Sequence, residues 1–217
     1  MKVSDLYTCL KKVYGFLGKW WPGLPEEIII GAVLTQNTNW KNVSRAIENL
    51  KKALGENDIL RKAEALSTEK LAELIRPAGF FNLKAKRLKA LLAFLKAYDF
   101  DLNRLKSVPT DALRKSLLEV KGVGKETADS ILLYALDKPV FVVDSYTKRL
   151  LKRLFNIDLQ GYDEIKNLFE SEYPPDLALY QELHGLIVEH AKRYCVKRPK
   201  CDECPLQENC YYASQLK

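Results

Sequence analysis

The sequence lacks any apolar stretch that could cross a membrane. Its longest apolar run, Ile28 to Leu34, is interrupted by Gly31, whereas a transmembrane helix needs about 20 apolar residues. Nothing resembles a secretory signal either, because the opening Met-Lys-Val-Ser-Asp is followed by no long apolar stretch. We therefore expect a cytoplasmic protein with no membrane partner.

Alternation of apolar and polar residues with a period of two is also missing, as are internal repeats and low-complexity linkers. These absences disfavour β-sheets and repeat architectures. Apolar residues instead recur at helical spacing at Val43, Ile47, Leu50 and Leu54, and at Leu88, Leu91, Leu92 and Leu95. Proline and glycine breaks divide the 217 residues into roughly ten expected helices. The pattern predicts an all-α fold of one large or two small domains.

Basic residues outnumber acidic ones, 35 to 28, which gives a net charge of +7 and an isoelectric point near 9.0. An excess of this kind suits a polyanionic partner, because each neutralised phosphate releases a counterion. A basic protein with no nucleic-acid role fits the charge equally well.

Four of the five cysteines gather near the C-terminus, in the pattern Cys195-x5-Cys201-x2-Cys204-x5-Cys210, while Cys9 stands alone. A cytosolic chain rarely uses such a group for disulfides. Four thiolates can ligate an iron–sulfur cluster or a zinc ion, but zinc sites usually show two close Cys-x2-Cys pairs, and here there is one. We expect a [4Fe–4S] cluster, with zinc as the alternative.

Basic side chains also lie inside this cysteine segment, at Lys197, Arg198 and Lys200. They suit contacts with phosphate, although a solvated run of charge is the simpler interpretation.

The segment from Leu118 to Leu133 contains Lys121-Gly122-Val123-Gly124-Lys125 between two stretches of helical spacing. Glycines allow left-handed backbone angles and a close approach of the backbone to another surface. The amides that open the following helix can then hold a phosphate. A Gly-x-Gly alone is more often a plain turn, but two flanking helices and two lysines favour a phosphate clamp.

Asp144 follows Pro139-Val-Phe-Val-Val, a mostly β-branched and aromatic run. It fits the N-cap of the next helix. It also fits a carboxylate held at the edge of an apolar wall, and the two interpretations are compatible.

The glycine hairpin followed by Val-Asp about twenty residues later resembles the helix-hairpin-helix DNA glycosylase superfamily, which includes endonuclease III. Three further segments match that family in order: Leu34-Thr35-Gln36-Asn37-Thr38, Ala78-Gly79-Phe80-Phe81-Asn82-x-Lys84-Ala85, and the C-terminal cysteines. The family's cysteine loop has gaps of six, two and five residues, so the first gap here is one residue short. The resemblance covers nearly the whole chain.

The resemblance implies two helical domains with the active cleft between them. Residues 24–136 would form a six-helix barrel with the hairpin at about 118–133, and residues 1–23 plus 137–217 would form the cluster domain, with its loop at 195–210. Gln36 would fill the hole left by a flipped base. The implied partner is damaged double-stranded DNA, and we expect the protein to act as a monomer.

Lyase members of the family carry a lysine two positions after the second hairpin glycine, where this chain has Glu126. Lys125 comes one residue early, and one residue rotates a helix by about 100°. We therefore expect a monofunctional enzyme, in which Asp144 orients a water nucleophile and stabilises positive charge on the sugar. AP lyase activity is not expected.

All three tryptophans, Trp20, Trp21 and Trp40, lie near the start of the barrel segment. They fit core packing or a stacking pocket for an extruded base, and tryptophan faces attract cations such as N3-alkylated purines. Trp-Trp-Pro with Leu-Thr-Gln-Asn-Thr resembles the 3-methyladenine glycosylase branch. Two alternatives remain: a bifunctional glycosylase and AP lyase acting on oxidised pyrimidines, and a non-catalytic DNA-binding module.

Overall fold

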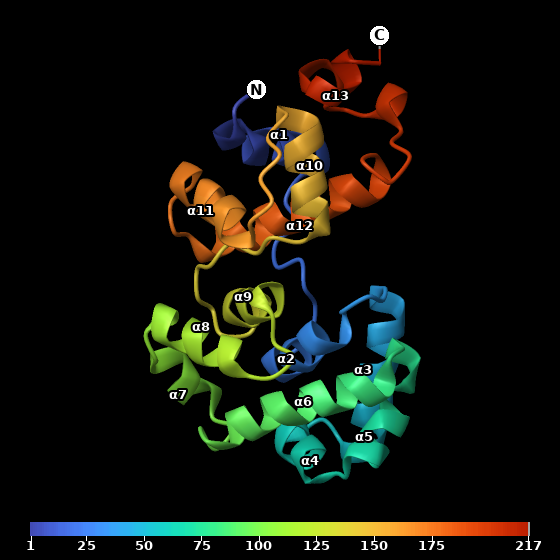
Figure 1. Cartoon of the computed structure of the whole chain (residues 1–217), viewed down its shortest axis with the longest axis vertical. Coiled ribbons are helices and arrows are strands. Elements are labelled where there is room, and N and C mark those ends of the chain that lie inside the picture. The colour runs from blue at the N-terminus through green and yellow to red at the C-terminus, as the bar shows by residue number, and fades with distance from the viewer. Residues whose placement is uncertain (217) are drawn as a thin grey trace. The chain divides into compact units, whose positions relative to one another are not determined.

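The computed structural model describes residues 1–216, and within them it contains helices and no strand (Figure 1). The expected all-α fold is confirmed. Thirteen α-helices occur in this part of the chain, more than the roughly ten expected, because several are too short for their periodicity to stand out. The described helices include none both long and apolar enough to cross a membrane.

The backbone divides into two compact units. One of them is a continuous stretch of the chain, Pro22–Lys138. Its helices are α2 (Pro25–Leu34), α3 (Trp40–Leu54), α4 (Ile59–Ala65), α5 (Thr68–Leu74), η2 (Arg76–Ala78), α6 (Phe81–Lys96), α7 (Leu102–Ser107), α8 (Thr110–Glu119) and α9 (Lys125–Tyr134).

The other unit joins the two ends of the chain, Met1–Trp21 and Pro139–Lys217. Its helices are η1 (Val3–Asp5), α1 (Leu6–Tyr14), α10 (Ser145–Phe155), α11 (Tyr162–Glu172), α12 (Leu177–Arg193), η3 (Cys201–Glu203), η4 (Gln207–Asn209) and α13 (Tyr211–Ser214). The expected domains, 24–136 and 1–23 plus 137–217, stay a prediction, because compactness alone does not show that each part is a folding domain.

Helix α2 forms the centre of the continuous unit. Every residue from Ile28 to Leu34 is buried, as expected for a helix that is apolar on all sides. It packs against α3, α6 and α9. Pro25 begins the helix at a position that needs no amide donor, with acidic Glu26 and Glu27 in the first turn.

Helix α6 runs alongside α4 and α5 (Figure 1). Its four predicted core leucines, from Leu88 to Leu95, are all buried, so the periodicity was a sound guide. Lys84 is buried on the same helix at 2% exposure. Its Nζ donates 2.8 Å hydrogen bonds to the carbonyl oxygens of Leu34 and Ala78, which ties the end of α2 to η2.

Helices α8 and α9 form the hairpin expected from the glycines. Gly122 has a φ of +92°, a value that a residue with a side chain rarely adopts, and Gly124 is the N-cap of α9. The fully buried Asp129 of α9 accepts hydrogen bonds of 2.7 and 3.0 Å from Arg114 of α8. This bidentate pair fixes one helix of the hairpin against the other.

Helix α12 is the core of the discontinuous unit and packs against α1 and α10. Its Glu182 is 2% exposed and accepts hydrogen bonds from the Tyr7 hydroxyl, from Lys11 Nζ at 3.2 Å and from the Leu17 amide at 3.0 Å. These bonds hold the N-terminal segment against α12. The residues from Val140 to Val143, directly before Asp144, are buried and belong to no helix or strand.

Candidate functional site

Asp144 caps helix α10 with one carboxylate oxygen. Its Oδ1 accepts a 2.7 Å hydrogen bond from the Thr147 amide and a 2.9 Å bond from the Thr147 hydroxyl. The N-cap interpretation is therefore confirmed. A cap of this kind leaves the carboxylate little rotational freedom.

The second oxygen of Asp144 faces His184 of α12, with 3.5 Å between Oδ2 and Nε2. The two side chains are 12% and 4% exposed, respectively. Sequence analysis did not identify His184 as a partner of Asp144. A single histidine forty positions after the aspartate carries no local signal of such a pairing.

Burial alone would raise the pKa of Asp144. The interaction with nearby His184, together with the bonds from Thr147, outweighs burial and lowers the pKa below its ordinary value of 3.8. Asp144 is therefore a carboxylate at neutral pH although it is largely removed from water. A negative charge so placed can orient a water molecule or stabilise a nearby positive charge.

Trp20 and Trp21 lie close to this pair in the same unit. The Trp20 ring meets His184 edge to face at 5.7 Å between centroids and meets Trp21 at 6.4 Å. Trp20 also packs tightly on Gly185, where an added Cβ would lie 2.6 Å from its Cγ. Trp21 is buried and Trp20 is partly exposed.

Lys192 places its ammonium group 5.2 Å from the centre of the Trp20 ring and 6.0 Å from that of Tyr146. The protein itself thus supplies a cation to Trp20. Trp40 belongs to the other unit, where it lines a groove with Glu27 and Lys51.

The hairpin turn presents its charged residues to solvent. Lys121, Gly124, Lys125 and Glu126 are exposed, whereas the side chain of Val123 is buried. Lys125 and Glu126 occupy the first turn of α9, where backbone amides have no intrahelical acceptor. The turn therefore combines the amides of a helix N-terminus with exposed lysines, a combination that suits an anion.

Gln36 lies just after α2 and binds this hairpin directly. Its Nε2 donates to the Gly122 carbonyl oxygen at 3.2 Å and to the Thr127 hydroxyl at 3.1 Å, while its Oε1 accepts from Arg87 Nη1. Sequence reasoning missed Arg87 and Thr127, because nothing in the local pattern links residues so distant in the chain.

Phe80 was also missed as a separate feature. It has a φ of 45°, uncommon for an aromatic residue, and its side chain is 69% exposed. Strained and exposed apolar residues cluster at binding sites. The quoted segment Ala78-Gly79-Phe80-Phe81 contained this signal, but only the backbone angle makes it visible.

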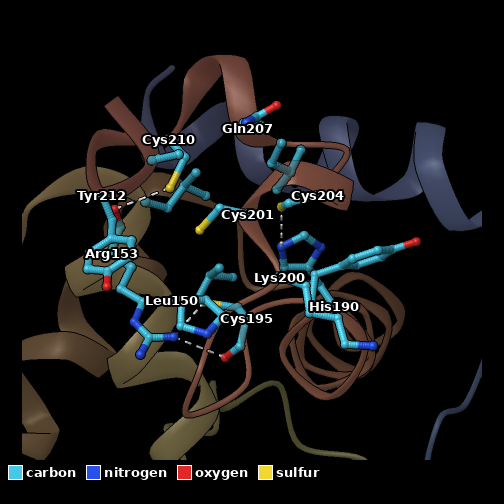
Figure 2. A pocket seen from close by; sticks show the side chains of 15 residues that line it. Leu150, Arg153, His190, Cys195, Lys200, Cys201, Cys204, Gln207, Cys210 and Tyr212 are labelled. Carbon is cyan, nitrogen blue, oxygen red and sulfur yellow. Dashed lines mark hydrogen bonds between the residues drawn. The ribbon is translucent and has the colours of Figure 1, made fainter. Parts of the chain in front are cut away.

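The four C-terminal cysteines line one cavity, together with His190, Leu150 and Arg153 (Figure 2). Arg153 donates to the Val196 carbonyl oxygen at 2.6 Å and to Cys195 Sγ at 3.5 Å. On the other side, His190 Nε2 lies 3.6 Å from Cys204 Sγ, and burial lowers the pKa of His190 to about 4. The cysteine pattern thus corresponds to one site in space.

The four cysteine side chains all line this cavity. Across residues 1–216 no three histidine, cysteine or acidic side chains come close enough together to hold a single metal ion. Burial, and then the neighbouring cysteines, raise the pKa of Cys201, and burial raises that of Cys204. Four thiolates would therefore repel one another unless a cationic group lay between them. Four thiol groups around one cavity are a donor set for a metal ion or an iron–sulfur cluster.

Lys197, Arg198 and Lys200 are exposed on the segment that joins Cys195 to Cys201. The carbonyl oxygen of Lys197 accepts a 3.1 Å hydrogen bond from Arg153. The same arginine thus supports both the cavity and the basic segment.

Comparisons with known proteins agree with this architecture. Residues 30–175 match the model of the HhH-GPD superfamily base excision DNA repair proteins. A "putative DNA repair glycosylase" of Methanocaldococcus jannaschii is 50% identical over 96% of this chain and 95% of its own length. The endonuclease III of Sulfolobus acidocaldarius is 29% identical over 99% of this chain and 98% of its own.

Among solved structures, the H. pylori 3-methyladenine DNA glycosylase bound to 1,N6-ethenoadenine has a TM-score of 0.79. It is 36% identical, and the match covers 89% of this chain and 98% of that chain.

Removal of His184 tests the electrostatics of this site. His184→Leu should raise the pKa of Asp144 above 3.8, because burial then acts without its main counterweight. His184→Gln, which keeps a hydrogen-bond donor at this position, should raise the pKa of Asp144 less. The carboxyl 13C shift of Asp144, followed through a pH titration, measures both.

The direction of the Asp144 pKa shift also predicts how the stability of the protein depends on pH. In the unmodified protein the lowered pKa contributes stability that is present above pH 3.8 and is lost as pH falls through the lowered value. In His184→Leu this contribution should shrink or reverse, which thermal unfolding at several pH values would show. An Asp144 pKa that stays unchanged in both variants contradicts the pairing.

Proposed function

Because the chain belongs to the HhH-GPD superfamily and is a base excision DNA glycosylase, we propose that it is monofunctional and releases alkylated purines such as 3-methyladenine from duplex DNA. The observation that carries the proposal is the buried, ionised carboxylate of Asp144, held by Thr147 and His184.

Cleavage of an N-glycosidic bond builds positive charge on the sugar as the base departs. A carboxylate about 4 Å from that charge contributes about 4 kcal/mol at an effective dielectric of about 20, which is roughly a thousandfold in rate. In the proposed mechanism Asp144 also acts as the base for water, the nucleophile in a monofunctional enzyme. His184 and Thr147 keep it ionised and aimed.

The first turn of α9 supports the monofunctional assignment. Schiff-base chemistry needs an amine at the sugar C1′, and the residue at the family's lyase position is Glu126, whose carboxylate cannot form an imine. Lys125 opens the same helix, where its charge suits a phosphate beside the glycine amides. It therefore acts with Lys121 in the phosphate clamp formed by Gly122, Val123 and Gly124.

The choice of alkylated purines rests on the aromatic surroundings and on the H. pylori relative, whose bound base is an ethenoadenine. Trp20 and Trp21 would stack on an extruded base. Lys192 already places a cation over the Trp20 ring. That ring face would therefore select a base by the area of stacking contact and not by attraction to the positive charge of the base. Trp40 would have a supporting role in its own unit.

A second candidate is a bifunctional glycosylase and AP lyase that acts on oxidised pyrimidines. It is favoured by the match to an archaeal endonuclease III over almost the whole chain, and it is disfavoured by Glu126.

DNA contacts would come from several elements. The hairpin would clamp a phosphate, Gln36 would fill the space of the flipped base, and exposed Phe80 would contact the bases as an apolar wedge. The basic segment with Lys197, Arg198 and Lys200 would contact a further phosphate.

Cys195, Cys201, Cys204 and Cys210 would hold a [4Fe–4S] cluster. Four cysteines around one cavity, without a point where three donors converge, suit a cluster better than a single zinc ion. The chemistry that the cluster supplies here is structural, because it would fix the loop that carries the basic residues. Arg153 would neutralise part of its negative charge.

Asp144→Asn should lose base release by roughly a thousandfold, because the neutral amide cannot stabilise the sugar charge. Binding of the same duplex should remain. Single-turnover release from oligonucleotides carrying 3-methyladenine, 1,N6-ethenoadenine or an oxidised pyrimidine measures the rate and the base preference together. Near-normal release by Asp144→Asn would refute the role of the carboxylate.

The unmodified enzyme should leave intact abasic strands that break only after alkali, and borohydride should trap no covalent complex. Lys125→Ala is the matched control, since Lys125 is the amine nearest to the lyase position. Efficient trapping that this variant loses would establish the bifunctional candidate instead.

Purified protein should contain about four iron atoms and about four acid-labile sulfides per chain. Cys201→Ser should lower both and should weaken DNA binding by loosening the basic segment. Elemental analysis with a sulfide assay gives the answer, and one zinc per chain without iron would show that the cluster assignment is wrong.

A further inference from the structure

We propose that Arg87 is a positioning residue that fixes the Gln36 side chain against the DNA-clamping hairpin. The inference rests on the proposed function, in which Gln36 fills the space of the flipped base and the hairpin holds a phosphate. It proposes that Arg87, on α6, couples phosphate binding by the hairpin to the filling of the flipped base's space by Gln36.

The hydrogen bonds around Gln36 define its orientation. A side-chain amide has one accepting oxygen and one donating nitrogen. Arg87 can only donate, so its bond to Oε1 turns Nε2 toward the Gly122 carbonyl oxygen at 3.2 Å and the Thr127 hydroxyl at 3.1 Å. The bond from Arg87 to Oε1 thereby keeps the amide from turning over.

The stem of Arg87 packs against the hairpin backbone as its guanidinium binds Gln36. A Cβ added to Gly122 would lie 2.8 Å from Arg87 Cδ and 2.9 Å from Arg87 Cβ, closer than packed carbon atoms approach. These atoms belong to the inner part of the arginine, so they cannot swing aside cheaply. The glycine is therefore required by Arg87 as well as by its φ of +92°.

Helix α6 also holds the backbone that precedes Gln36. Lys84, nearly one turn before Arg87, binds the carbonyl oxygen of Leu34 at 2.8 Å. Main chain and side chain of the glutamine segment are thus both held from one helix, which in turn contacts the hairpin through Gly122. Any displacement of the hairpin by a bound phosphate would reach Gln36 through this contact.

The arrangement holds the Gln36 side chain in a fixed orientation before DNA binds, and this preorganisation favours base release. A side chain that is already aimed loses less conformational entropy when it enters the duplex. Arg87 would thereby affect the formation of the flipped state, while the affinity for an intact duplex depends on the phosphate contacts.

The test is a double-mutant cycle of Gln36→Ala and Arg87→Met. Methionine keeps most of the stem and removes every donor. Single-turnover base release should fall about tenfold in Arg87→Met, with unchanged affinity for undamaged duplex. Adding Arg87→Met to Gln36→Ala should cause little further loss, because the arginine acts through the glutamine. Losses that multiply in the double variant would overturn the proposal.

Two controls separate this inference from the proposed function. Arg45→Met removes one exposed positive charge of α3 and should leave release unchanged. The Gln36 side-chain amide resonances, assigned by their loss in Gln36→Ala, should move toward the values of a free amide in Arg87→Met. If they stay in place, the positioning role is refuted; if they move but Gln36→Ala releases base normally, the proposed role of Gln36 fails instead.

Discussion

The arrangement of the candidate site depends on keeping a carboxylate ionised where little water reaches it. An isolated buried charge is costly and normally takes up a proton. Asp144 avoids this because Thr147 donates two hydrogen bonds to one oxygen and His184 faces the other. These partners come from α10 and α12, so the charge can persist only while the two helices are packed together. The same packing fixes the direction of the carboxylate.

A different constraint governs the other unit, where three distant segments meet around Gly122. The Gln36 amide, the Arg87 stem and the hairpin carbonyl lie within bonding or packing distance of one another. A larger side chain at position 122 would separate them. In the proposed function the glycine hairpin thus has two tasks: to approach a phosphate with its outer surface and to pack closely against Arg87 with its inner one.

Sequence reasoning predicted what depends on local periodicity and capping. The helical fold, the leucine face of α6 and the cap at Asp144 all follow from spacing and from residue type. The shorter helices were undercounted, because six or seven residues do not complete enough turns for a face to be recognised.

The sequence does not predict contacts between residues that only tertiary packing brings together. The sequence does not mark His184 as the partner of Asp144, because a pairing across forty residues leaves no local pattern. Arg87 carries no local signal either. The cation that Lys192 places over Trp20 altered the simple expectation of an aromatic slot for a charged base. Each of these three contacts depends on which helices pack together, and the periodicity of apolar residues does not determine which helices do so.

The most direct test of the central claim compares two abasic-site analogues in duplex DNA, a cationic pyrrolidine and a neutral tetrahydrofuran. If the Asp144 carboxylate stabilises positive charge on the sugar, the unmodified protein should bind the cationic analogue more tightly, by up to about a thousandfold. Asp144→Asn should lose that preference while it binds the neutral analogue as before. A preference of equal size in both proteins would contradict the account.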